Sequence, residues 1–437
     1  RGGTTETEIG GPAQTCAFDD GLYLNPGPAR IPQHHRALLG YCKEFGVALE
    51  VLVNRNGAAY SYQETRGPAG GPLAGRALRR RAVWADLRGY IAELLAKAVG
   101  ADALDAALTR EDRDRLLAYL HTFGDLADPA RYAGSYRRGY VVPPGAGLQA
   151  GEVGAPFALA PLLAADFWDQ LDFEWDEDQE PPLFQPVGGM DRIAAAFEQR
   201  VGRTIAYECE VREIRRTPAG VRVAYFDRRR GQTVQLDGDY CVCTLPLPVL
   251  RAIPNDLPPA VQAAIGQVDY VPVVKAGLQF ARRFWEDDEA LYGGITWTNQ
   301  PIGQIWYPST GYHVRKGVVL GAYARYDDAV ALGRLAPPAR EEQILAQGAR
   351  IHPQYPAEFE TGFSVAWHRI PYTGGGWAEY SPRARRAAYP LLTQSDGVIY
   401  LAGEHLSYLT GWQEGAILSA HAVIGQIAGR PARPRYE

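Results

Sequence analysis

The feature that most constrains the fold of this chain is a strand, a glycine turn and a helix that follow one another near the C-terminus. An apolar strand-like run at residues 397–402 leads into Gly403-Glu404, and a short loop leads through Gly411 into a helical pattern at residues 412–428. A helix N-terminus presents backbone N–H groups without intrahelical partners and the positive end of the helix dipole, so it stabilises negative charge placed there. The segment is a candidate anion site, although an ordinary buried helix with a glycine-rich approach explains the same pattern.

The 437 residues are too many for one hydrophobic core, so we expect two or three domains. Residues 4–30 read as short extended pieces between turns, and residues 34–45 have a helical pattern. Residues 71–178 are rich in Ala, Leu and Arg, which predicts a helical insertion with helices at 76–98 and 110–127 and without strands. The acidic run at residues 174–180, followed by two prolines, is typical of a solvated linker.

Strands dominate the pattern of the second half of the chain. Gly188-Gly189-Met190-Asp191 opens a predicted helix at residues 192–201. Predicted strands follow at residues 204–214, 221–226, 233–236, 240–244, 271–280, 303–307, 318–326, 358–367 and 397–402. Strands interleaved with helices, together with a helical insertion, indicate an α/β or α+β fold.

Charge and cysteine content exclude several classes of protein. The net charge of −5 and the pI near 6.0 provide no basic surface for nucleic acid or an anionic membrane. No apolar run approaches the roughly 20 residues that cross a bilayer. The five cysteines are scattered and require neither a disulfide framework nor a zinc site, so we expect a reducing cytoplasm. His34-His35 and the other histidines lack metal-ligand spacing, so no metal site is predicted.

Residues 400–416 resemble the C-terminal FAD-binding signature of the flavin monoamine oxidase and L-amino-acid oxidase superfamily, in which a strand ending in Ala-Gly-Glu precedes a loop and a Gly-Trp turn into a helix. Four further segments resemble family segments in the same order, at residues 187–191, 207–214, 284–287 and 371–377. The resemblance covers nearly all of the chain except parts of the helical insertion. It implies an FAD-binding domain of the amine-oxidase type, a mixed-sheet substrate domain and a helical insertion.

The resemblance also implies domain boundaries and cofactor contacts. The FAD-binding domain would comprise residues 1–11, 183–269 and 393–437, the substrate domain residues 12–70 and 270–392, and the helical domain residues 71–182. The backbone of Val211 would meet the adenine. The residues expected near the flavin are Gly403, Glu404, Gly411, Trp412, Gln413 and Ala416. The helix that begins there would point its positive end at flavin N1 and O2, where the reduced ring carries negative charge.

Residues 27–32 resemble the Gly-Pro-x-Arg-Ile/Leu-Pro motif of the amino-acid oxidase branch, and the overall layout is similar to bacterial L-tryptophan oxidases. The resemblance implies that Arg30 binds the substrate carboxylate. A guanidinium offers a two-donor fork that matches a carboxylate, and prolines on both sides stiffen its backbone. A surface or structural arginine is the alternative.

Three further residues are expected in the catalytic site. Lys275 stands among apolar strand residues, where burial of an ammonium is costly; the resemblance implies that it holds a water against flavin N5, and a lysine that reaches solvent from a strand end is the alternative. Tyr323 would help Arg30 hold the carboxylate, and Trp412 would form a wall of the substrate site.

Arg325 shares a strand face with Tyr323, because side chains alternate along a strand. Either it reaches the substrate side chain, which favours an acidic or polar amino acid, or it pairs with Asp327 or Asp328 outside the pocket. We prefer the second interpretation, since the aromatic content of the chain suits a large apolar side chain.

The resemblance implies FAD-dependent oxidation of an L-amino acid by O2 to a 2-oxo acid, ammonia and hydrogen peroxide. An amine oxidase, a decarboxylating amino-acid monooxygenase and a non-catalytic relative that has lost FAD are the alternatives. The family binds the FAD pyrophosphate with a Gly-x-Gly-x-x-Gly unit, which these 437 residues lack. We therefore expect that unit elsewhere in the same polypeptide or on a separate fragment. A homodimer is a further expectation.

Overall fold

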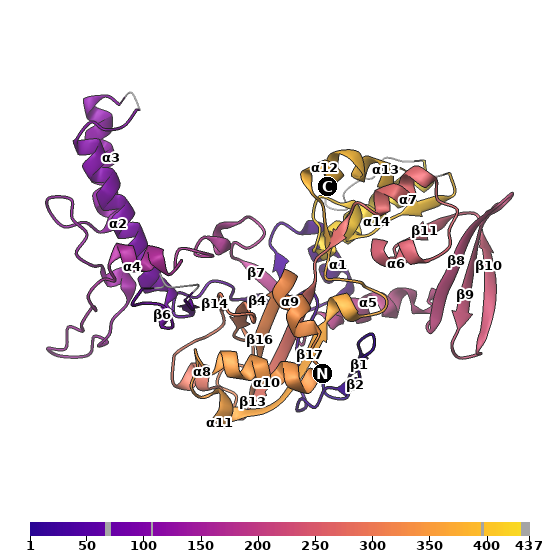
Figure 1. Ribbon diagram of the computed structural model, residues 1–437, viewed down its shortest axis with the longest axis horizontal. Coiled ribbons are helices and arrows are strands. Elements are labelled where there is room, and N and C mark those ends of the chain that lie inside the picture. Colours follow the sequence, from indigo (N-terminus) through magenta and orange to yellow (C-terminus); the bar gives the residue numbers. More distant parts are fainter. Residues whose placement is uncertain (66–70, 106–107, 395–396, 430–437) are drawn as a thin grey trace.

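The computed structural model describes residues 1–65, 71–105, 108–394 and 397–429. The molecule is elongated, with a pair of long helices at one end, a mixed sheet in the middle and a small antiparallel sheet at the other end (Figure 1). The central sheet has seven strands, in the order β17 (Phe359–Ala366), β13 (Val273–Phe280), β16 (Gly317–Arg325), β15 (Gln304–Trp306), β14 (Ile295–Thr298), β5 (Tyr60–Tyr62) and β6 (Ala77–Arg79). Only the β14–β5 pair is parallel.

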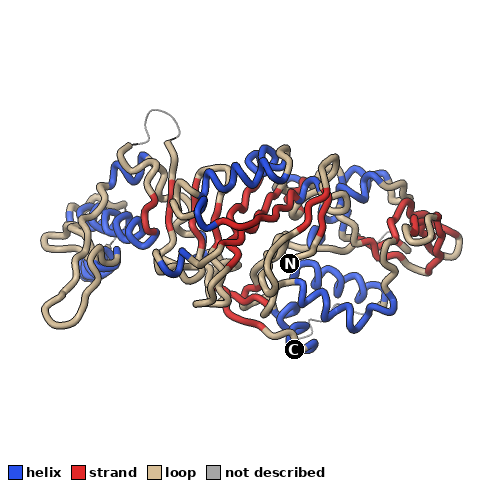
Figure 2. Tube along the Cα trace, turned by 90° about the horizontal axis from the view of Figure 1, so that it is seen from below, coloured by secondary structure: helices blue, strands red, loops and turns tan. Residues whose placement is uncertain are grey.

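The middle of the central sheet is buried on both faces. Every residue of β13 is buried, as expected for a valine-rich strand between two packed layers. One face packs against α9 (Tyr326–Gly333) and α10 (Pro337–Gly348), and Figure 2 shows helices lying along this sheet. Phe280, Trp285 and Tyr355 belong to the core beside it. The opposite face of β13 carries Lys275, so the sheet presents that residue away from the covering helices.

The strand, turn and helix predicted near the C-terminus are present in the structure. Strand β19 (Ile399–Leu401) pairs in parallel with β11 (Cys241–Cys243), and α14 (Gln413–Ile427) follows. Helices α1 (Arg36–Phe45) and α5 (Asp191–Val201) lie in the same part of the molecule (Figure 1).

The small sheet at the far end contains β8 (Cys209–Thr217), β9 (Gly220–Asp227) and β10 (Gln232–Gly238) in antiparallel order. The strand predicted at residues 204–214 is wrong in its first half. Residues 202–204 form a 3-10 turn, and Glu208 has a φ of 61°, which interrupts an extended chain. The strand therefore begins at Cys209.

The insertion consists mainly of helices, as predicted: α2 (Arg80–Gly100), α3 (Arg110–Gly124) and α4 (Leu159–Ala164). Helix α3 begins with a capping box between Thr109 and Asp112. The prediction that this stretch holds no strand is wrong at β6. Its three residues pair with β5 at the edge of the central sheet, so tertiary pairing overrides local helix propensity.

The acidic run was predicted to be a solvated linker, and this is wrong for two of its residues. Glu174 is buried and accepts from the Arg80 guanidinium at 2.9 Å, because the 3-10 turn Phe173–Trp175 directs it toward α2. Asp178 lies 2.9 Å from His34. The Glu174 contact joins two parts of the insertion, and the Asp178 contact joins the end of the insertion to the body of the molecule.

Short elements complete the structure. The remaining strands are β1 (Thr5–Thr7) with β2 (Ala13–Thr15), β12 (Asp269–Tyr270) with β18 (Ala378–Glu379), and the sheet β3 (Ile31–Pro32), β7 (Leu183–Pro186), β4 (Leu49–Leu52). The remaining helices are α6 (Leu247–Ala252), α7 (Pro259–Ile265), α8 (Phe284–Asp287), α11 (Tyr355–Glu358), α12 (Pro382–Ala387) and α13 (Tyr389–Leu392). Within the described ranges, no helix combines the length and the apolar character needed to cross a membrane.

Candidate active site

A cavity of about 620 Å³ lies between the face of the central sheet that carries Lys275, the loop before α1 and the beginning of α14. Its lining includes all four residues predicted to form the catalytic site: Arg30, Lys275, Tyr323 and Trp412. These residues lie far apart in the sequence, and the fold brings them together.

All six residues predicted near the flavin also line this cavity: Gly403, Glu404, Gly411, Trp412, Gln413 and Ala416. Val211 does not line it. That residue lies in β8, beside a β-bulge, and packs against the hydrophobic core around β11 and β19. Its predicted contact with adenine stays a prediction.

Arg30 lies inside the cavity and is surrounded by aromatic rings. Its guanidinium carbon is 4.5 Å from the ring centre of Trp306 and 5.5 Å from that of Phe173, and Nη1 donates to Asn54 Oδ1 at 3.3 Å. It forms no ion pair with any carboxylate of the described residues. Burial lowers the pKa of Arg30 to about 10. A buried cation without a counter-ion is costly, so this site favours an anionic ligand.

Lys275 points into the cavity and does not reach solvent, which removes the alternative of an exposed strand-end lysine. Its side chain is 5% exposed, and Nζ donates to the Gly27 carbonyl at 2.6 Å. Burial, and secondarily the charge of Arg30, lowers the pKa of Lys275 to about 7. The lowered pKa makes the neutral amine accessible, so Lys275 can hold a water or move a proton at Nζ.

Tyr323 lies opposite Lys275 in the antiparallel register of β16 and β13. The Lys275 Nζ is 4.4 Å from the centre of the tyrosine ring, and the Trp306 ring is 5.7 Å away. Burial raises the pKa of Tyr323, with partial opposition from the charges of Arg30 and Arg325. Its hydroxyl therefore keeps its proton and can donate to an anion.

The turn before α14 is held by Glu404. Its carboxylate accepts from the backbone N–H of Gly411 at 2.8 Å and of Ala378 at 3.1 Å. Gly411 has a φ of 83°, and an added Cβ would come within 3.3 Å of Trp377. Only glycine meets both conditions easily.

The beginning of α14 faces the cavity. Trp412 has an extended backbone and directly precedes the first helical residue, Gln413, and both line the cavity. The first-turn N–H groups and the positive helix end are thus directed at the space that a flavin ring would occupy. Burial also raises the pKa of Glu404, whose two backbone donors act in the opposite direction. The residues present therefore fit a bound flavin, with its negative charge at the helix end.

One positioning residue was not identified from the sequence. Glu414 is 3% exposed and accepts from the backbone N–H of Ala37 at 2.9 Å and of Leu38 at 2.7 Å, so it caps the N-terminus of α1. An acid in the first turn of a helix is usual because of the helix dipole, and that was the only available signal. Its partners lie more than 370 positions away in the sequence.

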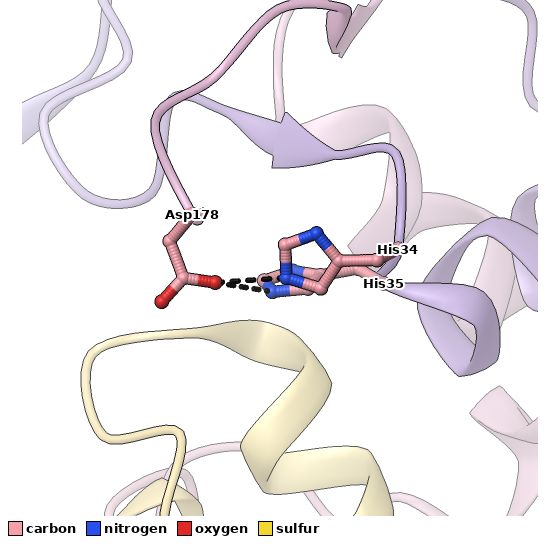
Figure 3. A group of neighbouring side chains, drawn as sticks. All are labelled: His34, His35 and Asp178. Carbon is pink, nitrogen blue, oxygen red and sulfur yellow. Dashed lines mark hydrogen bonds and ion pairs between the residues drawn. The ribbon is translucent and has the colours of Figure 1, made fainter. Parts of the chain in front are cut away.

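A group of three polar side chains lies at the edge of the cavity (Figure 3). The Asp178 carboxylate is 2.9 Å from His34 Nε2 and 3.5 Å from His35 Nε2, and these contacts lower the pKa of Asp178, with His35 as the larger cause. The ring of His35, which is 1% exposed, meets the ring of Trp412 edge-on at 5.0 Å. The group therefore positions a wall of the cavity.

The same group is a set of potential metal ligands that the sequence did not predict. The spacing of His34 and His35 did not suggest a site, but the fold adds Asp178, and the three ligand atoms lie within 4.8 Å of one another. Imidazole nitrogens and a carboxylate are ligand types that Zn²⁺ accepts.

Arg325 lines the cavity, which contradicts our preferred interpretation that it points outside. It follows Tyr323 on the same face of β16, and its guanidinium carbon is 5.9 Å from the tyrosine ring centre. Within the part of the chain that is described, it forms no ion pair with Asp327 or Asp328. Aromatic residues that the sequence did not single out also line the cavity: Phe173, Tyr270 and Trp367.

Comparisons with known proteins agree with this geometry. Residues 6–426 match the model of the family described as flavin containing amine oxidoreductase. An L-amino-acid oxidase from Siganus canaliculatus is 25% identical, covering 95% of this chain and 78% of that protein. The flavin-dependent L-tryptophan oxidase RebO from Lentzea aerocolonigenes is 26% identical, covering 97% of this chain and 92% of that protein.

Solved structures share the fold. A triple mutant of putrescine oxidase has a TM-score of 0.62 at 17% identity and covers 98% of this chain and 91% of that chain. Cyclohexylamine oxidase from Brevibacterium oxydans has a TM-score of 0.60 at 15% identity, with coverages of 98% and 91%. The family match spans the sheet, the cavity and α14 together. The chain therefore belongs to the flavin containing amine oxidoreductase family, and its cofactor is FAD.

Proposed function

We propose that this protein is an L-amino-acid oxidase, which converts an L-amino acid and O2 to a 2-oxo acid, ammonia and hydrogen peroxide. The observation that carries the proposal is Arg30, a partly buried guanidinium without a carboxylate partner among the described residues, which lines the cavity. An amine substrate would leave this cation unpaired, whereas the carboxylate of an amino acid neutralises it.

Arg30 and Tyr323 together bind and orient the substrate carboxylate. The guanidinium supplies two parallel donors and the phenol supplies a third, because its raised pKa keeps the hydroxyl protonated. A carboxylate held in this way fixes the position of the attached Cα, and such orientation is a large part of what a protein contributes to a cofactor reaction.

The other residues prepare the space next to the cofactor. The chemistry that FAD supplies when bound is the two-electron oxidation of the substrate Cα–N bond, with O2 as the final electron acceptor. Lys275 holds a water or a proton at Nζ, and the positive end of α14 stabilises negative charge in the cavity. Trp412 excludes water from one side.

We further propose a large side chain for the substrate. The aromatic residues Phe173 and Trp306, which lie beside Arg30, support a substrate larger than alanine or serine. We also propose a cytoplasmic location, for which the absence of any disulfide among the five cysteines is the support. Cell fractionation tests the location directly.

FAD also needs donors for its pyrophosphate, and we propose that polypeptide outside these 437 residues supplies them. The support is that the sequence contains no glycine-rich loop between a strand and a helix of the required type. Intact mass and flavin absorbance of the purified protein test this. A mass equal to that of the 437 residues, with FAD still bound tightly, would contradict it.

A peroxide assay across the twenty L-amino acids and their decarboxylated amines tests the proposed function. We expect peroxide from amino acids and not from the matching amines, with a 2-oxo acid as the product by mass spectrometry. An amide product would instead identify a decarboxylating monooxygenase, and turnover of amines alone would identify an amine oxidase. A purified protein without flavin absorbance would indicate a non-catalytic relative.

A further inference from the structure

The cavity contains a second guanidinium whose role the proposed reaction does not explain. Arg325 is two residues beyond Tyr323 on β16, on the same face, and it lines the cavity without an ion-pair partner in the described part of the chain. Its charge acts on both neighbours, because it contributes to lowering the pKa of Arg30 and opposes the rise in the pKa of Tyr323. Two like charges in one cavity need two anionic groups.

The lining offers no free carboxylate to neutralise Arg325. Glu404, the one acidic residue in the lining, is already occupied by the backbone N–H groups of Gly411 and Ala378. Lys275 adds a third basic group to the same space. The α-carboxylate of an amino acid neutralises one of these groups and leaves the others uncompensated.

The local backbone does not favour a cation at this position. Arg325 immediately precedes the first residue of α9, where the positive end of a helix disfavours a positive side chain. The next residue, Tyr326, has a φ of 54°, a left-handed conformation that costs about 1–2 kcal/mol for a residue with a side chain. Both the helix position of Arg325 and the backbone of Tyr326 are unfavourable, and the fold nevertheless directs Arg325 into the cavity. This points to a ligand there.

The aromatic lining does not by itself define an apolar side-chain pocket. The Trp306 ring lies 4.5 Å from Arg30 and 5.7 Å from the Lys275 nitrogen, and the Phe173 ring lies 5.5 Å from Arg30. These rings stabilise cations through their faces. The aromatic rings therefore do not exclude a charged substrate, and the basic groups of the lining indicate its chemistry.

We propose that Arg325 binds a carboxylate at the end of the substrate side chain, so that the preferred substrate is an acidic L-amino acid. This rests on the proposed amino-acid oxidase function and specifies its substrate class. Residues two apart on a strand are about 6.5 Å apart. A dicarboxylate of the length of L-glutamate or L-2-aminoadipate spans that separation, with one acid group at Arg30 and Tyr323 and the other at Arg325.

The first test compares kcat/KM of the FAD-loaded protein for L-glutamate and L-2-aminoadipate with that for L-glutamine and L-phenylalanine. We expect the acids to exceed the neutral amino acids by roughly 10²-fold, because loss of one member of a buried charge pair has an effect of that order. Arg325→Leu should lower kcat/KM for L-glutamate roughly 10²-fold and change L-glutamine by less than about threefold. Arg325→Lys should retain part of the preference.

Arg334→Leu is the matched control. Arg325 directly precedes α9 and Arg334 directly follows it, but Arg334 is exposed and does not line the cavity. This variant should leave the preference for acids unchanged. A wild-type preference for L-phenylalanine or L-glutamine over L-glutamate would overturn the inference. Equal losses for acidic and neutral substrates in Arg325→Leu would also overturn it.

A binding measurement without turnover separates this inference from the proposed function. Glutarate, a dicarboxylate without an amino group, should bind to the FAD-loaded protein and change the fluorescence of Trp306 and Trp412, which line the cavity. Arg325→Leu should weaken glutarate binding at least tenfold and leave butyrate unchanged. If no amino acid yields peroxide while glutarate still depends on Arg325, the oxidase proposal fails and the site for a second anion stands. Binding of glutarate that is equal in both proteins refutes the site.

Discussion

At the scale of single residues, the cavity is built around basic groups that the interior of a protein disfavours. Lys275 is buried and Arg30 is partly buried, and each lacks a carboxylate partner among the described residues. Aromatic faces and one carbonyl compensate them in part. The remaining demand for negative charge is what makes the cavity selective for an anionic ligand.

Replacement of Arg30 tests directly whether the cavity needs an anionic ligand. Arg30→Ala should lower kcat/KM for L-amino acids by roughly 10²- to 10³-fold, because the substrate carboxylate then enters the cavity without its partner. Any slow turnover of a decarboxylated amine should not fall, since that substrate does not use the guanidinium. The peroxide assay measures both, and full amino-acid activity in the variant would show that Arg30 does not bind the substrate.

The pKa of Lys275 makes stability depend on pH in a defined window. The pKa is lowered from 10.5 in the unfolded chain to about 7 in the fold, so between these values the unfolded state binds more protons. This residue therefore contributes a free energy of unfolding that rises with pH, by up to about 1.4 kcal/mol per pH unit, and that is constant below pH 7.

Urea denaturation of the wild type and of Lys275→Met at pH 6, 7, 8 and 9 isolates this contribution. The stability difference between variant and wild type should be largest at or below pH 7 and should shrink as the pH rises. A difference that is independent of pH would mean that the lysine keeps its proton throughout this range.

At the scale of secondary structure, the site depends on the junction of α1 with α14. Glu414, in the first turn of α14, caps the N-terminus of α1, and α1 is preceded by His35, whose ring meets Trp412. One carboxylate thus holds two helices that both contribute to the cavity wall.

Glu414→Gln should therefore lower the free energy of unfolding by about 1–2 kcal/mol, the range for a lost charged helix cap. Chemical denaturation measures this. Glu342→Gln, which makes the same change at an exposed position of α10, should have no measurable effect. Equal effects of both variants would show that the cap contributes nothing.

The resemblance of separate sequence segments to the family supplied the expected site residues. Arg30, Lys275, Tyr323 and Trp412 were each expected in the site, and the structure places all four around one cavity. The direction of Arg325 was misjudged, because two nearby aspartates offered a local partner and the orientation of the sheet is not visible in the sequence.

Contacts between distant residues could not be predicted. The cap of α1 by Glu414 and the contact of Asp178 with His34 both join residues more than 140 positions apart. Strands β5 and β6, of three residues each, carry too little pattern to be recognised, and they exist because the edge of the sheet pairs with them. Helices α9 and α10 were missed between strong strand signals.

At the scale of the whole molecule, the N-terminal segment is fastened to the helices behind the sheet by a buried ion pair. Arg340, in α10, is 0% exposed, and both of its terminal nitrogens donate to the carboxylate of Glu8 at 2.7 Å. The same carboxylate accepts from the backbone N–H of Ala366 in β17. Segments more than 330 residues apart are thereby joined.

Arg340→Met should lower the free energy of unfolding by about 3–5 kcal/mol, because it removes the guanidinium that pairs with both oxygens of the buried Glu8 carboxylate. The double variant Glu8→Met/Arg340→Met should recover much of that loss. Arg222→Met, which breaks the exposed pair with Asp237, should cause little measurable change. Urea denaturation compares the three, and a double variant as unstable as the single one would argue against a buried unpaired charge as the cause.

The contacts of Asp178 link the helical insertion to the wall of the cavity. This residue lies in the acidic run that ends the helical insertion, it contacts His34 and His35, and the His35 ring meets the ring of Trp412, which lines the cavity. The side chains of Asp178, His35 and Trp412 thus connect the helical insertion with the wall of the cavity. We therefore expect that a contact which displaces the helical insertion also displaces the Trp412 ring.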